Sequence, residues 1–332
     1  MNDMNILICD DSAIARKALS SNIALSSNST LFHAENGKEG LRIIRDNPID
    51  ILFLDLTMPV LDGFGVLNHL PVNKHPTQII VISGDIQQKA KQRCYQLGAH
   101  EFIEKPFKPE EIADVLLRYG IPVAQKLAHL RPKYELSEHD VIANIKEISN
   151  VALGTSAALI SEQFDRFIDM PLPNVASLHH SELQMTLQDI VNNSEYRAIS
   201  QRFVGNGING EALVCLQGSD LSKLIEDEDE DEEITENEAI LDISNLLVSS
   251  FLSSFNKQLD ITVSLRQPIV LETEQLKVAL KEEGSFLSGY DTNIFTIEFV
   301  YSAETLNLKC DVIFLMDNDS LSSIKSTLES VL

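Results

Sequence analysis

Short runs of hydrophobic residues alternate with amphipathic stretches over the first part of the chain. Four runs are aliphatic and apolar on both faces, as the strands of a covered parallel sheet are: NILIC at 5–9, DILFLDL at 50–56, QIIVIS at 78–83 and EFIEK at 101–105. The stretches between them have helical amphipathic spacing: 12–24, 37–46, 62–70, 86–97 and 109–118. This alternation predicts a doubly wound α/β domain over residues 1–120.

A second domain is expected after a linker at 121–135. Gly120 and Pro122 favour the end of the last helix of the first domain. Pro132 and a helix N-cap at Ser137 then mark the start of a new folded region. We therefore expect the second domain to span residues 136–332.

The second domain contains an internal repeat. An acid-x-x-Asn phrase occurs as EISN at 147–150 and as DISN at 242–245. Two further pairs of segments match between the halves: ALVCLQGSDLSKLI at 212–225 with DVIFLMDNDSLSSI at 311–324, and the proline-containing stretches 170–175 and 266–271. The repeat predicts two helix–strand–strand–helix units, about 136–225 and 234–332, joined by the acidic run 226–233. Two such copies usually pair about a pseudo-twofold axis, with their strands merged into one sheet and helices packed on it.

The helix that carries the second phrase has two distinct stripes. One is polar and the other apolar, and their members are Glu238, Asp242, Asn245 and Ser249 against Ile240, Ile243, Leu247 and Phe251. The apolar stripe is expected to face the core, so the acid and the amide face outward. A polar stripe of this kind can be plain solvated surface. Thr235-x-x-Glu238 also forms a capping box, which is the role we expect for Glu238.

Composition limits the classes of function. The net charge is −24, of which −2 falls in residues 1–130 (13 basic, 15 acidic) and −22 in the remainder. A half this acidic repels phosphate backbones, which argues against a nucleic-acid partner. No apolar run is long enough for a membrane helix and no signal peptide is visible, so we expect a cytoplasmic protein. The four cysteines have no metal-ligand spacing and are expected to be buried free thiols.

Polar residues follow each predicted strand of the first domain. They comprise three acids, one hydroxyl and one lysine: Asp10, Asp11, Asp55, Ser83 and Lys105. Ligands of open α/β sheets bind beyond the carboxyl ends of the strands, where these side chains converge. Three close carboxylates repel one another unless a cation lies among them, and oxygen ligands suit Mg²⁺. The arrangement predicts a site for a metal ion and a phosphorylated carboxylate.

Residues 1–120 thereby resemble the receiver (CheY-like) domain of two-component response regulators, a five-stranded flavodoxin-like fold. The resemblance implies that Asp55 accepts the phosphoryl group from a histidine kinase. It also implies that Mg²⁺ is held by Asp10, Asp11 and Asp55 with the carbonyl of Thr57. Lys105, before a cis peptide to Pro106, would contact the phosphoryl group, while Ser83 and Phe102 occupy the switch positions.

Residues 136–332 resemble the CheC/CheX/FliY family of chemotaxis phosphatases, an α+β fold with an internal pseudo-twofold repeat. The resemblance rests on the duplicated phrase, the proline stretches and FVGNGINGEAL at 203–213. It implies that a helix docks on a phosphorylated receiver, where the Asn orients a water and the acid bonds the receiver's lysine. The residues that correspond are Glu147 and Asn150 in the first copy and Asp242 and Asn245 in the second.

This sequence departs from the family pattern at two positions. Ala143 stands where Asp or Ser is common, and Asp242 is one methylene shorter than the usual Glu. The first copy is therefore favoured as the better site. Within the same segment, GNGING at 205–210 matches a dinucleotide-binding pattern, but strand-like neighbours favour a hairpin turn there.

The sequence thus predicts a response regulator with a phosphatase output that acts on a CheY-type receiver or on its own Asp55. The alternative is a non-catalytic binding or dimerisation module, switched by phosphorylation, that docks receivers or flagellar-motor components. A DNA-binding regulator is disfavoured because no helix-turn-helix follows the receiver. The cognate kinase, the target receiver, the direction of regulation and a homodimer through the fourth-helix face stay open.

Overall fold

The computed structural model divides the chain into two compact units, residues 1–134 and 135–332. The residues that it describes are 4–23, 29–70, 76–121, 136–163, 167–170, 172–179, 181–182, 184–185, 188, 196–217, 235–271, 293–303 and 308–331. The acidic run 226–233 and, apart from Ile121, the predicted linker 121–135 lie outside these residues. Each unit is described by itself below.

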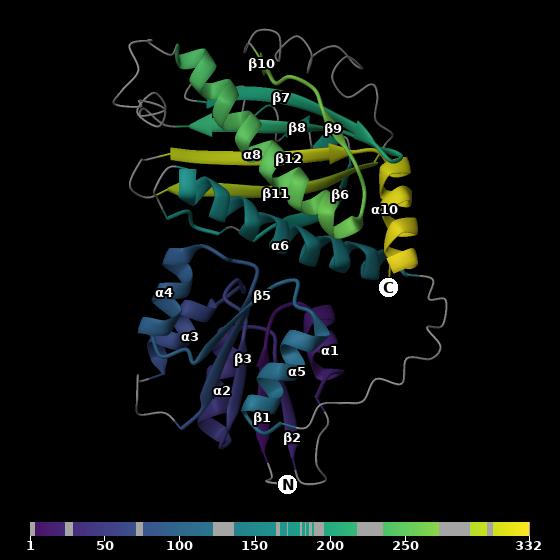
Figure 1. Ribbon diagram of the computed structural model, residues 1–332. Helices are drawn as coiled ribbons and strands as arrows, with labels where there is room; N and C mark the ends of the chain where they lie inside the picture. The colour runs from purple at the N-terminus through teal and green to yellow at the C-terminus, as the bar shows by residue number, and fades with distance from the viewer. Residues whose placement is uncertain are drawn as a thin grey trace. The chain divides into compact units, whose positions relative to one another are not determined.

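The first unit is a five-stranded parallel sheet with the strand order β2-β1-β3-β4-β5, which confirms the predicted doubly wound α/β fold (Figure 1). Its elements in chain order are β1 (Asn5–Cys9), α1 (Ala13–Ser20), β2 (Thr30–Ala34), α2 (Gly37–Asp46), β3 (Ile51–Leu54), α3 (Gly63–His69), β4 (Gln78–Ser83), α4 (Gln88–Gln96), β5 (Glu101–Glu104) and α5 (Pro109–Arg118).

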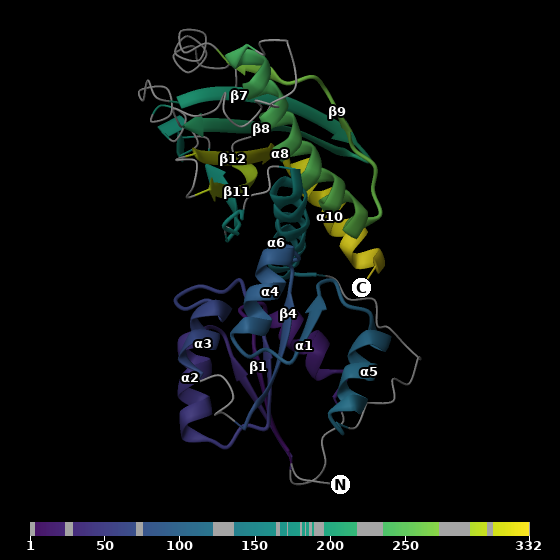
Figure 2. The ribbon, with the colours of Figure 1, turned by 60° about the vertical axis from the view of Figure 1, so that its left-hand side comes forward.

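Helices cover both faces of this sheet. The helices α2, α3 and α4 enclose one hydrophobic cluster, and α1 and α5 enclose the other (Figure 2). All four residues of β3 are buried, as a strand covered on both faces requires. The carboxyl ends of the strands therefore meet at one edge, where the polar groups are found.

Strand β2 has no counterpart among the hydrophobic runs of the sequence. Its residues, TLFHA, lie at the edge of the sheet, and Ala34 alone is fully buried. An edge strand with one exposed side does not need a continuous apolar run, so its sequence signal is weak.

Within the described residues, the second unit contains one antiparallel sheet and three helices of 26, 24 and 14 residues. The sheet order is β10-β7-β8-β12-β11-β6, with β9 also paired to β7. Its elements are α6 (Glu138–Gln163), β6 (Asn174–His179), β7 (Tyr196–Gly205), β8 (Ile208–Gln217), α8 (Glu236–Leu259), β9 (Ser264–Leu265), β10 (Ile269–Leu271), β11 (Asn293–Ala303), β12 (Leu308–Met316) and α10 (Asn318–Val331).

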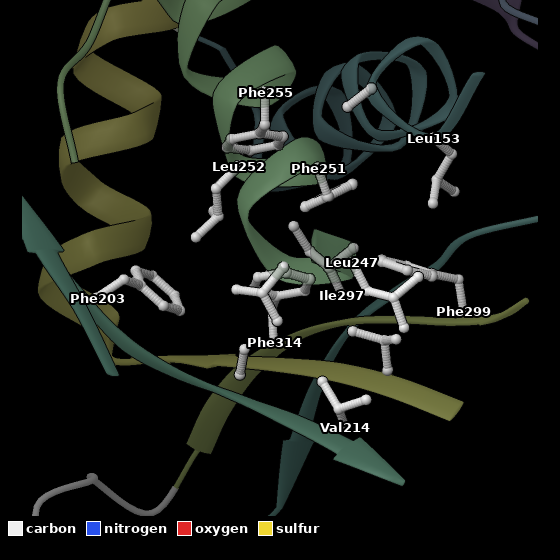
Figure 3. Packing of buried hydrophobic residues seen from close by; sticks show 14 of the residues in the cluster. Leu153, Phe203, Val214, Leu247, Phe251, Leu252, Phe255, Ile297, Phe299 and Phe314 are labelled. Atoms are coloured by element: carbon white, nitrogen blue, oxygen red, sulfur yellow. The ribbon is translucent and has the colours of Figure 1, made fainter. Parts of the chain in front are cut away.

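The three helices lie on one face of the antiparallel sheet (Figures 1 and 2). Aromatic rings fill the layer between helix and sheet: Phe251 of α8 lies 4.7 Å from Phe314 and 5.0 Å from Phe299, measured between ring centroids (Figure 3). Phe251 is fully buried. This aromatic layer fixes α8 over the middle of the sheet and so sets the positions of its polar stripe.

Each expected repeat contains at least one more strand than the sequence indicated. The proline stretches 170–175 and 266–271 run into strands β6 and β10, so the described part of the first copy has three strands, and the second copy has three plus the two-residue strand β9. Strands β6 and β10 are short and half-exposed edge strands, which explains why their apolar pattern is weak. The helix expected within 218–225 falls outside the described residues.

Three local predictions for the second unit are confirmed. GNGING forms the two-residue hairpin between β7 and β8, with Asn206 and Gly207 at φ 50° and 74°. Thr235 and Glu238 form the capping box of α8. The apolar stripe of α8 is buried and its Asp242 and Asn245 are exposed.

The four cysteines are buried free thiols, as expected. Burial raises the pKa of Cys9, Cys94 and Cys215 to about 12, and that of Cys310 in the same direction. These thiols stay protonated and unreactive at neutral pH. Among the described residues, no helix combines the length and apolar character needed to span a membrane.

Candidate phosphoryl site and helix motif

Three carboxylates gather at the carboxyl edge of the parallel sheet. Asp10 and Asp11 follow β1 and Asp55 follows β3, and one ligand atom from each lies within 4.8 Å of the others. Asp10 and Asp55 are buried. Thr57, half-buried, follows in the loop after β3. The three acids therefore lie close together, as their positions after the strands predict.

Lys105 extends into the same cluster from the end of β5. Its Nζ lies 2.8 Å from Asp10 Oδ2 and 3.3 Å from Asp55 Oδ2, and the lysine is 7% exposed. The peptide bond between Lys105 and Pro106 is cis, as the sequence analysis expected. One ammonium against three carboxylates leaves an excess of negative charge, so the donor set fits a divalent cation held by oxygen.

The loop after β3 is packed tightly beneath Asp55. A Cβ added at Gly63 would lie 2.3 Å from the backbone oxygen of Asp55, so a side chain there requires the backbone to move. The N–H of Gly63 donates to the carbonyl of Leu56 at 2.9 Å, and Asp62 caps α3 by accepting from the N–H of Gly65. Glycine at position 63 therefore allows α3 to approach the strand that carries Asp55.

Ser83 lies at the end of β4 and is fully buried. Its Oγ accepts a hydrogen bond from the backbone N–H of Asp85 at 3.1 Å. The carboxylate of Asp85 accepts from both the backbone and the side-chain amide of Gln87. Burial of Asp85 raises its pKa to about 6, and the bonds from Gln87 oppose part of that rise.

Phe102 on β5 is half-buried and contacts a basic side chain of α4. The Nζ of Lys91 lies 5.7 Å from the centroid of the Phe102 ring and 2.5 Å from Oε1 of Glu104. Lys91 thus joins α4 to the aromatic residue and to the acid two positions further along β5. The sequence pattern indicates Phe102 but gives no sign of Lys91.

In the second unit, Asp242 and Asn245 line an open groove of about 510 Å³ between α8 and the segment from β9 to β10. Leu241, Leu265, Arg266, Gln267 and Pro268 line the same groove. Gln201, buried on β7, closes its floor and donates from Nε2 to Oδ1 of Asn245 at 2.9 Å. Asn245 is therefore an exposed residue whose amide oxygen is held from below.

Glu147 and Asn150 lie one turn apart on α6. Glu147 is half-buried, whereas Asn150 is buried at 6% exposed, unlike the exposed Asn245 of the second phrase. The amide oxygen of Asn150 has no hydrogen-bond partner among the described residues. The two acid-x-x-Asn phrases thus occupy separate helices, α6 and α8, which pack against each other.

Sequence reasoning missed the groups that surround the predicted residues. Gln201 and Arg266 come from a strand and a turn remote in sequence from Asn245, and Lys91 lies in a helix with no motif. Their roles depend on strand register and helix rotation, so no local pattern indicates them.

Comparison with known proteins identifies the first unit. The response regulator receiver domain family matches residues 6–117. Protein-glutamate methylesterase/protein-glutamine glutaminase 3 of Geobacter sulfurreducens is 35% identical over 118 residues, which cover 35% of this chain and 32% of that protein. A probable cyclic di-GMP phosphodiesterase of Vibrio cholerae is 27% identical over 210 residues, covering 61% of this chain and 42% of that protein.

The similarity extends to solved structures. The REC domain of AraT, a response regulator from Geobacillus stearothermophilus, is 29% identical with a TM-score of 0.33, covering 36% of this chain and 93% of that one. The chain spans less than half the length of the two curated relatives. The family match and the acid cluster within it together establish that residues 6–117 are a CheY-like receiver domain of a two-component response regulator.

Proposed function

We propose that this protein is a response regulator that is phosphorylated on Asp55 and that dephosphorylates the aspartyl phosphate of a CheY-type receiver through its second unit. The observation that carries the proposal is the presence of an acid and an Asn one turn apart on each of two paired helices, in a chain that begins with a receiver. The second unit would be a CheC-like tandem repeat. Its sheet order, β10-β7-β8 followed by β12-β11-β6, supports a pseudo-twofold relation between the copies.

Phosphorylation would begin with in-line attack by a carboxylate oxygen of Asp55 on the phosphorus of a phosphohistidine in a partner kinase. The new P–O bond forms as the P–N bond to histidine breaks. Lys105, 3.3 Å from Asp55, would neutralise charge on the transferred group. The residues that would hold Mg²⁺ are Asp10, Asp11 and Asp55, with the carbonyl of Thr57, and the ion would supply further charge neutralisation there.

The phosphoryl oxygens would then draw Ser83 toward Asp55. For this the hydrogen bond from the N–H of Asp85 to Ser83 must rearrange. Phe102 would move inward and leave its contact with Lys91. The local change is thereby passed to the face made by α4, β5 and α5.

Hydrolysis would use the amide of Asn150 to orient a water molecule for in-line attack on the aspartyl phosphate of a receiver. The water oxygen bonds to phosphorus as the bond to the aspartate oxygen breaks, which gives inorganic phosphate and a free carboxylate. The amide oxygen accepts a hydrogen bond from the water, so the residue acts by positioning. Glu147 would bond the lysine of that receiver. The substrate is a separate receiver or the chain's own Asp55.

A second candidate is a non-catalytic module that binds receivers or flagellar-motor components, or dimerises, under control of Asp55. The shorter acid at Asp242 favours this role for the second copy, because its carboxylate reaches less far than that of Glu147. Under both candidates a histidine kinase is a partner, with no nucleic acid and no membrane insertion, in the cytoplasm; the second unit binds a receiver under the first candidate, and a receiver, a flagellar-motor component or a second copy under the other.

The lifetime of phosphate on a receiver tests the proposal. A CheY-type receiver is loaded with acetyl phosphate and Mg²⁺, and the full chain is added as wild type or as Asn150→Ala, Asn245→Ala or both. We expect the wild type to shorten the lifetime and the double variant to lose this effect. Asn174→Ala, which changes an exposed Asn of β6, is the matched control. An unchanged lifetime with wild type would rule out hydrolysis of that substrate and favour the binding module.

A further inference from the structure

The amide of Gln201 fixes the direction in which the amide of Asn245 points. Nε2 of Gln201 donates to the backbone carbonyl of Arg266 and to Oδ1 of Asn245, both at 2.9 Å. A carbonyl oxygen can only accept, so the nitrogen of Gln201 must face Arg266. Its second N–H then faces Asn245, which must turn its oxygen toward Gln201. The NH₂ group of Asn245 is left to face the groove.

Rotating the side-chain amide of either Gln201 or Asn245 by about 180° would weaken the hydrogen bonding between them. If Asn245 turned over, two NH₂ groups would meet over a glutamine that is 1% exposed. If Gln201 turned over, two carbonyl oxygens would face each other at Arg266. The observed arrangement already leaves Oε1 of Gln201 without a partner among the described residues, and each reversal would in addition lose a hydrogen bond, which costs free energy. The orientation of Asn245 is therefore set by the carbonyl of Arg266, through Gln201.

Strand register shows which residue holds the equivalent place in the first copy. Ninety-five residues separate Asn150 from Asn245, and the same interval separates Val175 on β6 from Val270 on β10. Val175 pairs with Ile297 on β11, and Val270 pairs with Ile199 on β7.

Ile199 and Ile297 therefore occupy matching positions in the two copies. Two residues further along each strand stand Gln201 and Phe299, and both side chains point to the helix-covered face of the sheet.

Phe299 has no hydrogen-bond donor, so the first copy lacks the group that holds the amide oxygen in the second. In agreement, Oδ1 of Asn150, which is itself buried, has no hydrogen-bond partner in the described part of the chain. The two copies thus share the Asn but differ in the residue at the matching strand position, Gln201 in one case and Phe299 in the other. The difference affects the amide oxygen, which is the side-chain atom of Asn that can accept a hydrogen bond from a water molecule.

We propose that Gln201 is a positioning residue that makes the second copy non-hydrolytic by holding the oxygen of Asn245 away from the groove. Asn150 then carries the hydrolysis, and the helix α8 contributes binding through Asp242 and the NH₂ group of Asn245. This inference rests on the proposed phosphatase function of the second unit. A neutral hydrogen bond that must break before the oxygen can turn outward corresponds to a factor of roughly two to ten in activity.

The hydrogen bonds of Gln201 are tested first, by a measurement that needs no enzymatic activity. In the full chain labelled with ¹⁵N-glutamine, both side-chain protons of Gln201 are expected to exchange slowly with water. Asn245→Ala should speed the exchange, because it removes one acceptor, whereas Asn174→Ala should not. Rapid exchange in the wild type, or no effect of Asn245→Ala, overturns the proposal.

The consequence for hydrolysis is tested by releasing Asn245 in a chain whose first copy is disabled. Asn150→Ala is expected to lose most of the activity, and Asn150→Ala with Gln201→Met is expected to recover about two- to tenfold over it. Adding Asn245→Ala should abolish the recovery. Methionine keeps the shape of glutamine without its hydrogen bonds, and circular dichroism checks that each variant is folded.

The matched control is Gln258→Met, which removes a half-buried glutamine of α8 that donates to the carbonyl of Ile148 and does not contact Asn245. It should give no recovery. Full activity of Asn150→Ala alone, or no gain from Gln201→Met while the wild type is active, overturns the proposal. An inactive wild type instead overturns the proposed phosphatase function, and the exchange measurement still decides whether Gln201 holds Asn245.

Discussion

The two units place their polar groups by different structural means. In the receiver domain the candidate residues follow strands of a parallel sheet. Because parallel strands end at the same edge of the sheet, these residues converge there. In the second unit the candidate residues lie on helices, and their surroundings come from strands and turns far away in sequence. A site at strand ends is therefore specified by local sequence, whereas a site on a helix surface is specified by packing.

The largest effect is expected in the receiver domain, from Asp55→Asn. The amide cannot act as the nucleophile, so labelling by radioactive acetyl phosphate should be lost completely. Asp62→Asn is the control, because Asp62 is an exposed N-cap and Asn caps helices equally well. Label retained after Asp55→Asn would place the acceptor on another residue and weaken the distinction drawn between strand-end and helix-surface sites.

Phe251→Ala tests whether the two units are stabilised independently. Phe251 is fully buried and its ring contacts Phe299 and Phe314, so the truncation should cost the second unit about 3–5 kcal/mol. Hydrogen exchange followed by mass spectrometry should show lost protection in peptides from 136–332 and none in those from 4–121. Val204→Ala, at a position 46% exposed, should change stability by less than about 0.5 kcal/mol. Equal loss of protection in both units would mean that they unfold together.

Asp85→Asn is expected to have the smallest effect, a gain in stability that depends on pH. Burial raises the pKa of Asp85 from 3.8 to about 6, so the folded state binds this proton more tightly than the unfolded state. The free energy of unfolding from this group therefore falls as pH rises from about 4 to 6, and then levels off. At pH 7 the variant should be more stable than wild type by roughly 1–3 kcal/mol.

Urea unfolding at pH 4.5 and pH 7 measures this difference. The gain should be large at pH 7 and small at pH 4.5, because the wild-type carboxyl is protonated in the folded state at the lower pH. Asp114→Asn, an exposed acid of α5, should show no such dependence. If the free energies of unfolding of variant and wild type differ by the same amount at pH 4.5 and at pH 7, the raised pKa of Asp85 does not limit stability.

Much of the fold could be predicted because each element carries its own signal. The runs that became β1, β3 and β4 are apolar on both faces, and the capping box and the hairpin turn are short local patterns. Strand β2 and strands β6 and β10 were harder, because edge strands need no full apolar stripe. At these positions, pairing with the neighbouring strand, and not the local sequence pattern, determines that a strand forms.

The candidate sites divide in the same way. Asp10, Asp11, Asp55 and Lys105 were predictable since each directly follows a strand. Gln201 was not, because its relation to Asn245 depends on the pairing of β7 with β10 and on the rotation of α8. The contrast between Gln201 and Phe299 becomes visible only when both registers are known.

The burial of all four cysteines has a practical consequence for spectroscopy. Because the thiols are inaccessible and their pKa values are raised, maleimide reagents at neutral pH will leave the folded protein unlabelled. A cysteine introduced at an exposed position of each unit, such as Tyr95 or Val204, could then carry a spin or fluorescence label without removal of the native residues. Distances between such labels would measure whether the separation of the two units changes when acetyl phosphate and Mg²⁺ are added.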